Sequence, residues 1–579
     1  MKQTVTLIHN KNAGYPSKET LFRPSIAYPE YPFDEIASRS NAIYAMVREG
    51  FRLSGYDQEH YGSDRWNPLS RFIKLHDCVL IKPNMVRNFN VEGRDVTCLY
   101  TNPSLVAAVI DYVVLALRDA EGKQTGRIII GDAPLQTCNF SALVQQSGYS
   151  DLLAYYREKG IDIEMIDFRN TVSMRKNGLL YQTESEQEHG CIVQLGEKSA
   201  FAELTKAQMD KLRITSYGPS QLKSHHSVGH HEYKIANAVL EADVVINMPK
   251  PKTHRKAGIT AALKNMVGIS ADKTYLPHHM MLSKEEGGDA YLYADNGKRI
   301  RDELLDAMNE AALHQQLEIQ KLLKLAIDDY EKDRKKNILD PYNEGSWYGN
   351  QTIWRTIADL NKILFYADKS GEIQQERQRR YLIVADMILS GDHEGPLEAL
   401  PVSAGVIAMG ENPVLFDRVL ASLMGFDYSR IPSLTNIPAG DSEDVMVVSN
   451  DDRWDKCSYI PQKDAIFFVP ADGWSVALGN KENDALLAKI REKNLDKIYI
   501  WGCSARGLGL ANYFYHNGFT NIIFLDQDPA KWSADVFCSM PCIAPDKREH
   551  TVSIITVPQK YWKEISKVRT PSEVFWYLE

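Results

Sequence analysis

Four short apolar runs along the chain alternate with stretches of helical periodicity. Each run is rich in β-branched residues and ends close to a charged or amide side chain, a pattern that predicts buried strands. The runs lie at 78–84, 127–134, 244–246 and 380–386. Between the first two, apolar positions recur at helical spacing after Asn102, with Pro103 in the first turn. Strands that alternate with helices indicate an α/β fold with a mainly parallel sheet, whose polar strand tips share one edge.

The same pattern divides the chain into four parts. Residues 1–75 form an N-terminal strand and helical lead-in, and the α/β core covers 76–280 and 376–485. The intervening segment, 281–375, is a helical insertion, because residues 299–335 are charged, amphipathic and free of Gly and Pro. Residues 486–579 predict a small Rossmann-like domain of strand, glycine turn, helix and second strand.

One segment, Asp243–Gly268, concentrates the polar chemistry. Its strand ends at Asn247 and is broken by Pro249 and Pro251. The residues that follow are cationic or can act on protons: Lys250, Lys252, Thr253, His254, Lys256, Lys264 and Asn265. Open α/β sheets bind ligands beyond the carboxyl ends of their strands. The segment therefore predicts part of a functional pocket, and a solvated basic loop is the alternative.

The length, net charge and cysteine content of the chain limit the kinds of partner and the cellular compartment that we expect. The chain has 579 residues, enough for two to four domains, and a net charge of −9, which argues against nucleic acid as the main partner. No apolar window is long enough to span a bilayer, and the N-terminus lacks the apolar core of a signal peptide. The eight scattered cysteines lack zinc or iron–sulfur spacing. We therefore expect a cytoplasmic protein without an iron–sulfur cluster.

Lysines at strand tips can hold a carboxylate or phosphate, and a lysine among other cations has a lowered pKa and can act as a base. We expect His254, with a pKa near the working range, to act with Lys264 and Lys252 in catalysis. The predicted substrate-binding residues are Lys82, Asn84, Asp132, Lys250, Thr253, Asn265 and Arg355. The aromatic segment around Arg355 suits a stacking wall for a ligand or a buried cluster with a paired Arg–Asp.

Histidines cluster in the same region of the sequence. His225, His226, His230 and His231 fall within seven residues. Imidazole is the commonest ligand of transition metals, and Asp386, Glu394 or Asp132 could complete a site for a divalent metal. The alternative is a set of exposed loops that tolerate histidine.

The C-terminal part carries an imperfect dinucleotide fingerprint. Gly502, Gly507 and an acid at a strand tip, Asp526, have the expected spacing, but Ser504 stands where the second glycine belongs. This predicts a nucleotide site or, alternatively, a Rossmann-like domain used for docking.

Several of these motifs match a known family. The segments IKPN (Ile81–Asn84), TNPSLV (Thr101–Val106), IGDAP (Ile130–Pro134), NMPKPKTH with GITAALKNMVG, EGP (Glu394–Pro396) and NPVLFDRVLASLMG (Asn412–Gly425) occur in the order of the domain-of-unknown-function 362 family. Residues from about 75 to 480 resemble that family. The resemblance implies an α/β, enzyme-like fold whose reaction is unsettled. Some relatives carry ferredoxin-type cysteine clusters, and this chain does not.

Two further resemblances suggest a type of reaction and a biosynthetic pathway. His254, Gly258 and Lys264 are similar in order to a motif of the lactate racemase family, which tethers a nickel-bearing nicotinic-acid cofactor to the lysine. The second glycine of that turn and the acid–arginine motif near the first strand are missing here, so the likeness suggests a reaction type and not the cofactor. FLDQDPAKW (Phe524–Trp532) and MPCIAP (Met540–Pro545) resemble Rossmann-like modules of surface-glycan biosynthesis proteins.

The leading hypothesis is an enzyme that abstracts a proton or hydride from a small oxyanion such as a hydroxy acid or sugar acid, as a racemase or epimerase does. One alternative is a glycan-pathway enzyme that binds a nucleotide sugar or phosphate. Another is a non-enzymatic scaffold that senses a metabolite. The expected partner, besides the small anionic substrate, is either a second copy of the chain or a glycan-pathway protein.

Overall fold

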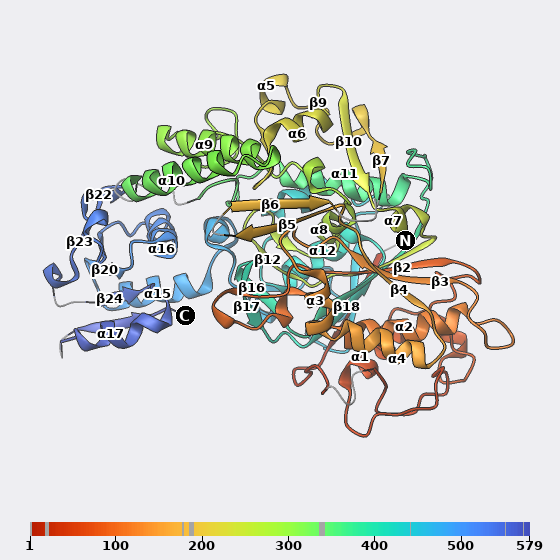
Figure 1. The fold of residues 1–579 in the computed structure, drawn as a ribbon. Coiled ribbons are helices and arrows are strands. Elements are labelled where there is room, and N and C mark those ends of the chain that lie inside the picture. The colour runs from red at the N-terminus through yellow and green to blue at the C-terminus, as the bar shows by residue number, and fades with distance from the viewer. Residues whose placement is uncertain are drawn as a thin grey trace.

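The computed structural model describes residues 3–17, 22–176, 179–184, 190–334, 342–440, 442–549, 552–570 and 573–578. At its centre is an eight-stranded sheet in the order β19-β1-β18-β15-β11-β2-β3-β4 (Figure 1). These strands are β19 (Val445–Ser449), β1 (Gln3–His9), β18 (Val406–Gly410), β15 (Arg380–Met387), β11 (Val244–Met248), β2 (Cys78–Pro83), β3 (Arg127–Asp132) and β4 (Ile163–Asp167). All are parallel except β18, which is antiparallel to both neighbours. The predicted mainly parallel α/β fold is confirmed.

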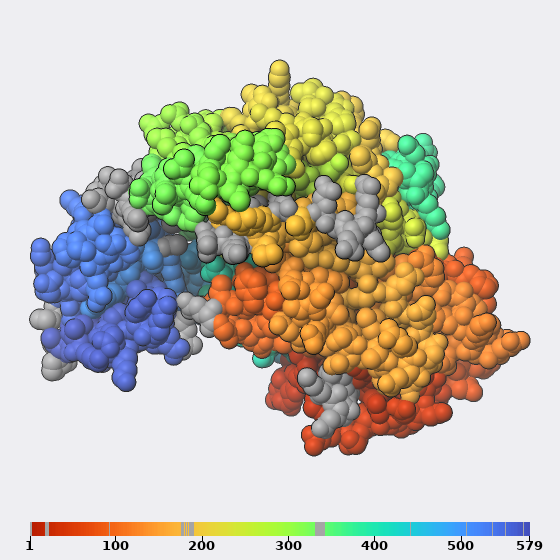
Figure 2. Space-filling view, in the orientation of Figure 1, coloured from red at the N-terminus to blue at the C-terminus, as the bar shows by residue number. Residues whose placement is uncertain are grey.

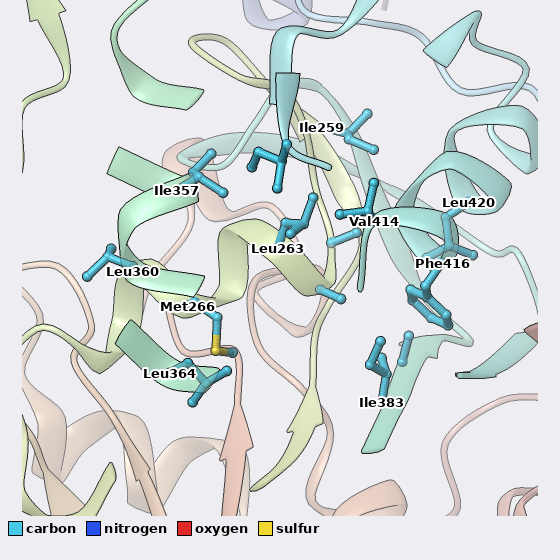
Figure 3. Close-up of a cluster of buried hydrophobic side chains, with 14 of the residues drawn as sticks. Ile259, Leu263, Met266, Ile357, Leu360, Leu364, Ile383, Val414, Phe416 and Leu420 are labelled. Carbon is cyan, nitrogen blue, oxygen red and sulfur yellow. The ribbon is translucent and has the colours of Figure 1, made fainter. Parts of the chain in front are cut away.

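Both faces of the sheet are buried, which explains why its strands read as continuous apolar runs. Val79 and Ile81 of β2 face a core closed by α1 (Ala42–Leu53), α2 (Pro103–Leu117) and α4 (Tyr149–Glu158), and Leu80 faces the opposite core. The opposite core is closed by α7 (Asn237–Glu241), α8 (Ala262–Asn265), α11 (Ile353–Tyr366) and α12 (Pro413–Leu423). In Figure 3, Leu263 of α8 lies among side chains of α11 and α12.

The helix α2 begins as its sequence predicts. The side chain of Asn102 caps it by accepting a hydrogen bond from the N–H of Ser104 at 3.0 Å, and Pro103 occupies the first turn. Farther along the helix, Asp111 is 2% exposed, and its Oδ1 accepts a hydrogen bond from the Tyr156 hydroxyl at 2.5 Å. Burial raises the pKa of Asp111 to about 7.

This buried carboxyl should make stability depend on pH. Because the folded-state pKa of Asp111 lies above its unfolded value, the free energy of unfolding should be lower at about pH 8 than at about pH 5, since up to about pH 7 the folded state holds a proton that the unfolded state has already lost. Asp111→Asn keeps an acceptor for Tyr156 and should remove about 2 kcal/mol of this fall. Urea titrations at the two pH values measure it, and identical pH slopes for both proteins would contradict the prediction.

Two elements lie in the core although the sequence places them elsewhere. β1, in the predicted lead-in, runs between β19 and β18 inside the main sheet. α11, in the predicted insertion, packs its buried face, including Ile357 and Leu364, on the sheet core. Both differences arise because tertiary burial, which a linear pattern does not show, decides which elements join a sheet.

The predicted lysine loop is itself a strand. β12 (Lys252–His254) joins β13 (Gly258–Thr260), β16 (Ser390–Glu394) and β17 (Glu398–Val402) in a four-stranded sheet of order β13-β12-β16-β17. The pairing of Lys252 with Gly391 anchors the lysine loop to the segment after β15. The loop is therefore held on both sides and is not a solvated connection.

Smaller elements from the described parts of 171–235 and 279–334 form a cap, whereas β4 and β11 belong to the main sheet. The hairpin β5 (Thr171–Lys176) and β6 (Leu179–Glu184) contacts α9 (Asn296–Leu313) and α10 (Leu317–Arg334), the helix pair expected from the charged amphipathic pattern. The remaining elements between β3 and β14 are α3 (Phe140–Ser147), β7 (Cys191–Gln194), α5 (Lys206–Met209), β8 (Leu212–Arg213), α6 (Pro219–His225), β9 (His226–Ser227), β10 (His230–Ile235) and β14 (His279–Met280). Among the described residues, no helix is long and apolar enough to cross a membrane.

The C-terminal part forms a separate lobe, blue in Figure 2. Its sheet has the order β22-β23-β21-β20-β24-β25, with strands β22 (Ser533–Phe537), β23 (Met540–Ile543), β21 (Ile522–Leu525), β20 (Ile498–Trp501), β24 (Val552–Ile555) and β25 (Val574–Tyr577). The five parallel strands follow the 3-2-1-4-5 order typical of dinucleotide-binding sheets. Its helices are α15 (Lys481–Glu492), α16 (Ala505–His516) and α17 (Trp562–Lys567).

Candidate functional site

The carboxyl ends of β2, β3, β11 and β15 bring two buried ion pairs to one edge of the sheet. Lys82 Nζ lies 2.7 Å from Asp132 Oδ1, and Lys250 Nζ lies 3.0 Å from Asp386 Oδ2, with all four side chains at most 2% exposed. Burial lowers the pKa of both lysines and raises that of Asp132, while each ion pair opposes the shift. Both predicted anion-binding lysines, Lys82 and Lys250, thus already have a carboxylate partner.

Close packing keeps the first pair in place. Asp132 also accepts hydrogen bonds from the N–H groups of Met85 and Ala133, at 2.6 and 2.9 Å. A Cβ on Gly268 would lie 1.9 Å from Asp132 Oδ1 and 2.7 Å from Lys82 Nζ, so only glycine fits beside the pair. The turn after α8 is therefore shaped around this ion pair.

Tyr15 completes the second pair and was missed by the sequence interpretation. Its hydroxyl donates to Asp386 Oδ1 at 2.7 Å and accepts from the Lys250 ammonium. Burial, with the nearby Asp386 charge, raises the pKa of Tyr15. The only sequence signal for it was the N-terminal strand, because β1 runs parallel to β15 and ends at the same edge.

Three asparagines tie the strand tips together. Asn265 Nδ2 donates to Asn247 Oδ1 at 2.7 Å, and Asn265 Oδ1 accepts from Lys82 Nζ and Asn84 Nδ2, both at 3.2 Å. Asn247 donates in turn to the hydroxyl of Tyr381 at 2.6 Å. The structure thus places Asn265, a predicted substrate contact, in the scaffold, whereas Asn84 is half-buried.

Lys252 is buried without a carboxylate partner among the described residues. Its ammonium donates to Asn84 Oδ1 at 2.6 Å and to the carbonyl of Lys250 at 2.8 Å, both uncharged acceptors. Burial, and then the charges of Lys250 and Lys264, lower its pKa to about 7. An unneutralised ammonium in this position is costly to the free protein and suits an anionic ligand.

The other two residues of β12 differ in their orientation. His254 Nδ1 accepts hydrogen bonds from the N–H groups of Lys256 and Ala257, at 3.0 and 3.2 Å. Burial and then the Lys264 charge lower the pKa of His254, so the expected value near neutrality was wrong, and the neutral ring carries its proton on Nε2. Thr253 points the opposite way, as strand alternation requires, and donates to the carbonyl of His393 at 2.8 Å.

Lys264 is the most available of the predicted catalytic groups. It is half-buried in α8 and, within the described part of the chain, its ammonium makes no hydrogen bond or ion pair. Burial, with the charges of Lys273 and Lys256, lowers its pKa to about 7. The sequence interpretation missed Asp417, whose two carboxylate oxygens accept from the N–H groups of Ala262 and Leu263, at 2.7 and 2.9 Å, and so fix the start of α8.

Two further lysines extend the cationic surface. Lys273 Nζ donates to the carbonyls of Ala133 and Val267, at 3.0 and 3.2 Å, and burial lowers its pKa to about 8. Lys256 Nζ donates to the Thr215 hydroxyl at 3.0 Å; burial lowers its pKa to about 8, although the charge of Glu344 opposes the shift. The abundance of lysine was visible in the sequence, but the approach of Lys273 to the strand tips was not.

Arg355 does not belong to this cluster. Its guanidinium lies over the Trp354 ring, 4.4 Å from the centroid, and pairs with Glu203. Asp359, the expected partner, instead accepts from the Tyr233 hydroxyl and the N–H of Ala200, at 2.9 and 2.7 Å. The aromatic segment is therefore a packing cluster with a different ion pair from the one expected.

The predicted metal ligands do not converge. His226 donates from Nε2 to the carbonyl of Tyr275 at 2.8 Å, and its Nδ1 lies 3.1 Å from His231 Nδ1. His225 and His230 both approach Glu232, Asp386 is held by Lys250 and Tyr15, and Glu394 accepts from the N–H of Asp472. Across the described residues, no three His, Cys, Asp or Glu side chains are arranged to hold a metal ion.

The glycines of the C-terminal fingerprint lie in close contact with their surroundings. A Cβ on Gly507 would lie 2.0 Å from the carbonyl of Gly502, so glycine permits the helix to approach the strand, and Ser504 precedes that helix. Asp526 accepts from the N–H of Cys503 at 3.0 Å and pairs with Lys531 at 2.6 Å. Its carboxylate is thus engaged within the lobe, and α16 itself contacts residues 472–474 of the core.

The part of the chain that carries the lysine cluster is similar to known proteins. The sequence profile of a family described as Domain of unknown function (DUF362) matches residues 79–184 and 176–422, together more than half of the chain. The thylakoid-associated protein sll1697 of Synechocystis sp. is 25% identical over 236 residues, 41% of this chain and 52% of that protein, so the chain spans about half the length of this curated relative. No solved structure is similar enough to match. The chain belongs to the DUF362 family.

Proposed function

We propose that this chain is an enzyme that binds a small anionic metabolite, a hydroxy acid or sugar acid, at the carboxyl edge of the main sheet and moves a proton on it. The observation that carries the proposal is the pair Lys252 and Lys264, two ammonium groups with lowered pKa and no carboxylate partner among the described residues. Anions bind where such charges are pre-arranged and water is largely excluded.

Each residue has a distinct role in this proposal. Lys252, held by Asn84, grips the carboxylate of the metabolite. Lys264, with a pKa of about 7, is partly neutral near neutral pH and accepts the proton from the carbon beside that carboxylate. His254 donates from Nε2 to the oxygen on which negative charge develops, because its Nδ1 is occupied by backbone N–H groups. The carbon is planar once it has lost its proton, so return of the proton from the Lys264 ammonium to the opposite face, after the bound intermediate has turned, inverts the configuration, whereas return to the same face regenerates the substrate.

The surrounding groups support this chemistry without entering it. The ion pairs Lys82–Asp132 and Lys250–Asp386 fix the strand tips. Asp417 positions α8 and thereby Lys264. A cytoplasmic location belongs to the same proposal, and the free thiols of all eight cysteines suit a reducing compartment.

Exchange of carbon-bound protons tests the activity directly. The protein is incubated in D₂O with a panel of 2-hydroxy acids and sugar acids, and NMR follows loss of the proton beside the carboxylate. Lys264→Gln should slow the exchange by about 100-fold or more, the size of a general-base contribution. Lys493→Gln, at an exposed lysine of the C-terminal lobe, is the matched control and should exchange as the wild type does. Absence of exchange and of binding across the panel would overturn the proposal.

A further inference from the structure

The lysine cluster carries more positive charge than one carboxylate would balance. Among the described residues around the strand tips, two carboxylates, Asp132 and Asp386, form ion pairs with lysines. Five ammonium groups lie in the same region, those of Lys82, Lys250, Lys252, Lys264 and Lys273. Each carboxylate is already within 3.0 Å of one lysine, Lys82 or Lys250. Three ammonium groups are therefore left with neutral acceptors or with none among the described residues.

These three cations lie at different depths. Lys252 is fully buried, and its ammonium bonds to the half-buried Asn84. Lys264 and Lys273 are both half-buried and lie near one another, on the segment that runs from α8 past the turn at Gly268. Lys273 is tied to the tip of β3 through the carbonyl of Ala133 and to the turn through the carbonyl of Val267. The cluster therefore has an inner cation and an outer pair.

We propose that the natural ligand of this site carries two anionic groups, one bound by Lys252 with Asn84 and the other by Lys273 beside Lys264. This inference rests on the proposed function and adds the substrate class: a hydroxy acid with a second carboxylate or with a phosphate. Both groups present charged oxygens to an ammonium, and such charge-assisted contacts are the stronger class of hydrogen bond. The second group also neutralises charge that a single carboxylate would leave buried.

Matched ligand pairs test the inference by calorimetry on the full chain. Lactate is compared with malate, which adds a carboxylate, and glycerate with 3-phosphoglycerate, which adds a phosphate. In each pair, the doubly charged member should bind at least about tenfold more tightly if one further charge-assisted contact forms. The two arms distinguish a dicarboxylate from a phosphorylated acid.

Two variants of Lys273 identify the group responsible. Lys273→Gln, which keeps a neutral hydrogen-bond donor but removes the charge, should lose most of the tenfold advantage of the doubly charged ligands, and Lys273→Arg should retain it. Equal affinities within both pairs, or an advantage that survives in Lys273→Gln, would overturn the inference while the proposed function stands. If none of the four ligands binds the wild type, the proposed function fails as well.

Discussion

Asp132→Asn should lower the free energy of unfolding by about 3–5 kcal/mol, one of the largest effects expected of a single substitution in this chain. Lys82 is fully buried and has Asp132 as its only carboxylate within 4.0 Å among the described residues. Loss of the carboxylate charge leaves an ammonium among uncharged groups, including the Asn265 amide and the carbonyl of Pro83. Urea denaturation followed by circular dichroism measures the loss.

The pH dependence of this loss identifies its cause. In the variant, burial without the opposing carboxylate keeps the folded-state pKa of Lys82 below its unfolded value of about 10.4. The folded state then binds fewer protons than the unfolded state, so stability rises with pH. The deficit should therefore be smaller at about pH 9 than at about pH 6.5.

A double variant is the control for packing. Lys82→Met with Asp132→Asn removes both charges, keeps similar volumes, and leaves an acceptor for one of the two N–H groups, of Met85 and Ala133, that bond to the separate oxygens of Asp132. Replacement of a buried pair by uncharged groups is often close to neutral, so most of the lost stability should return. A single variant within about 1 kcal/mol of wild type would show that the pair contributes little.

The sequence was sufficient to predict the sheet and its polar edge, for a physical reason. Each strand that is buried on both faces must be apolar along its length, so β2, β3, β11 and β15 were visible as runs that end in polar residues. Parallel strands place those ends side by side, which brought Lys82, Asp132, Lys250 and Asp386 to one edge. This argument predicts where the candidate site lies, namely at the carboxyl edge of the main sheet.

The pairing within the site could not be predicted in the same way. Lys82 bonds to Asp132 and not to a ligand because its ammonium lies 2.7 Å from the Asp132 carboxylate. This contact is possible because Gly268 has no side chain beside the pair. Lys252 and Thr253 were both candidates, and strand alternation points them in opposite directions, but the strand that pairs with β12 is β16, which lies about 140 residues away in the sequence. Pairing between strands that are far apart in the sequence cannot be predicted from the local pattern of apolar and polar residues.

The histidine cluster shows the same limit of sequence-based prediction. The spacing of His225, His226, His230 and His231 is compatible with a shared face, but a hairpin between β9 and β10 separates them. His226 and His231 contact each other, whereas His225 and His230 approach Glu232. The spacing of the four histidines along the chain shows that they are close to one another. It does not show in which direction their ring nitrogens point.

Lys252→Met should weaken binding of an anionic ligand by about 100-fold and at the same time stabilise the free protein by about 1–2 kcal/mol. The two effects have one cause. The ammonium of Lys252 is fully buried and, in the described part of the chain, has only neutral acceptors, Asn84 and the carbonyl of Lys250, so its charge disfavours folding until a ligand arrives. Methionine fills a similar volume without the charge.

The pH dependence again separates this explanation from a packing effect. The folded-state pKa of Lys252, about 7, lies below its unfolded value, so the folded wild type binds fewer protons and its stability rises between about pH 7 and about pH 10. Lys252→Met should lack that part of the rise. Thermal unfolding at several pH values, with and without malate, measures both effects. A variant that is less stable than wild type would mean that Lys252 serves the fold, because a group kept only for binding is expected to destabilise the free protein.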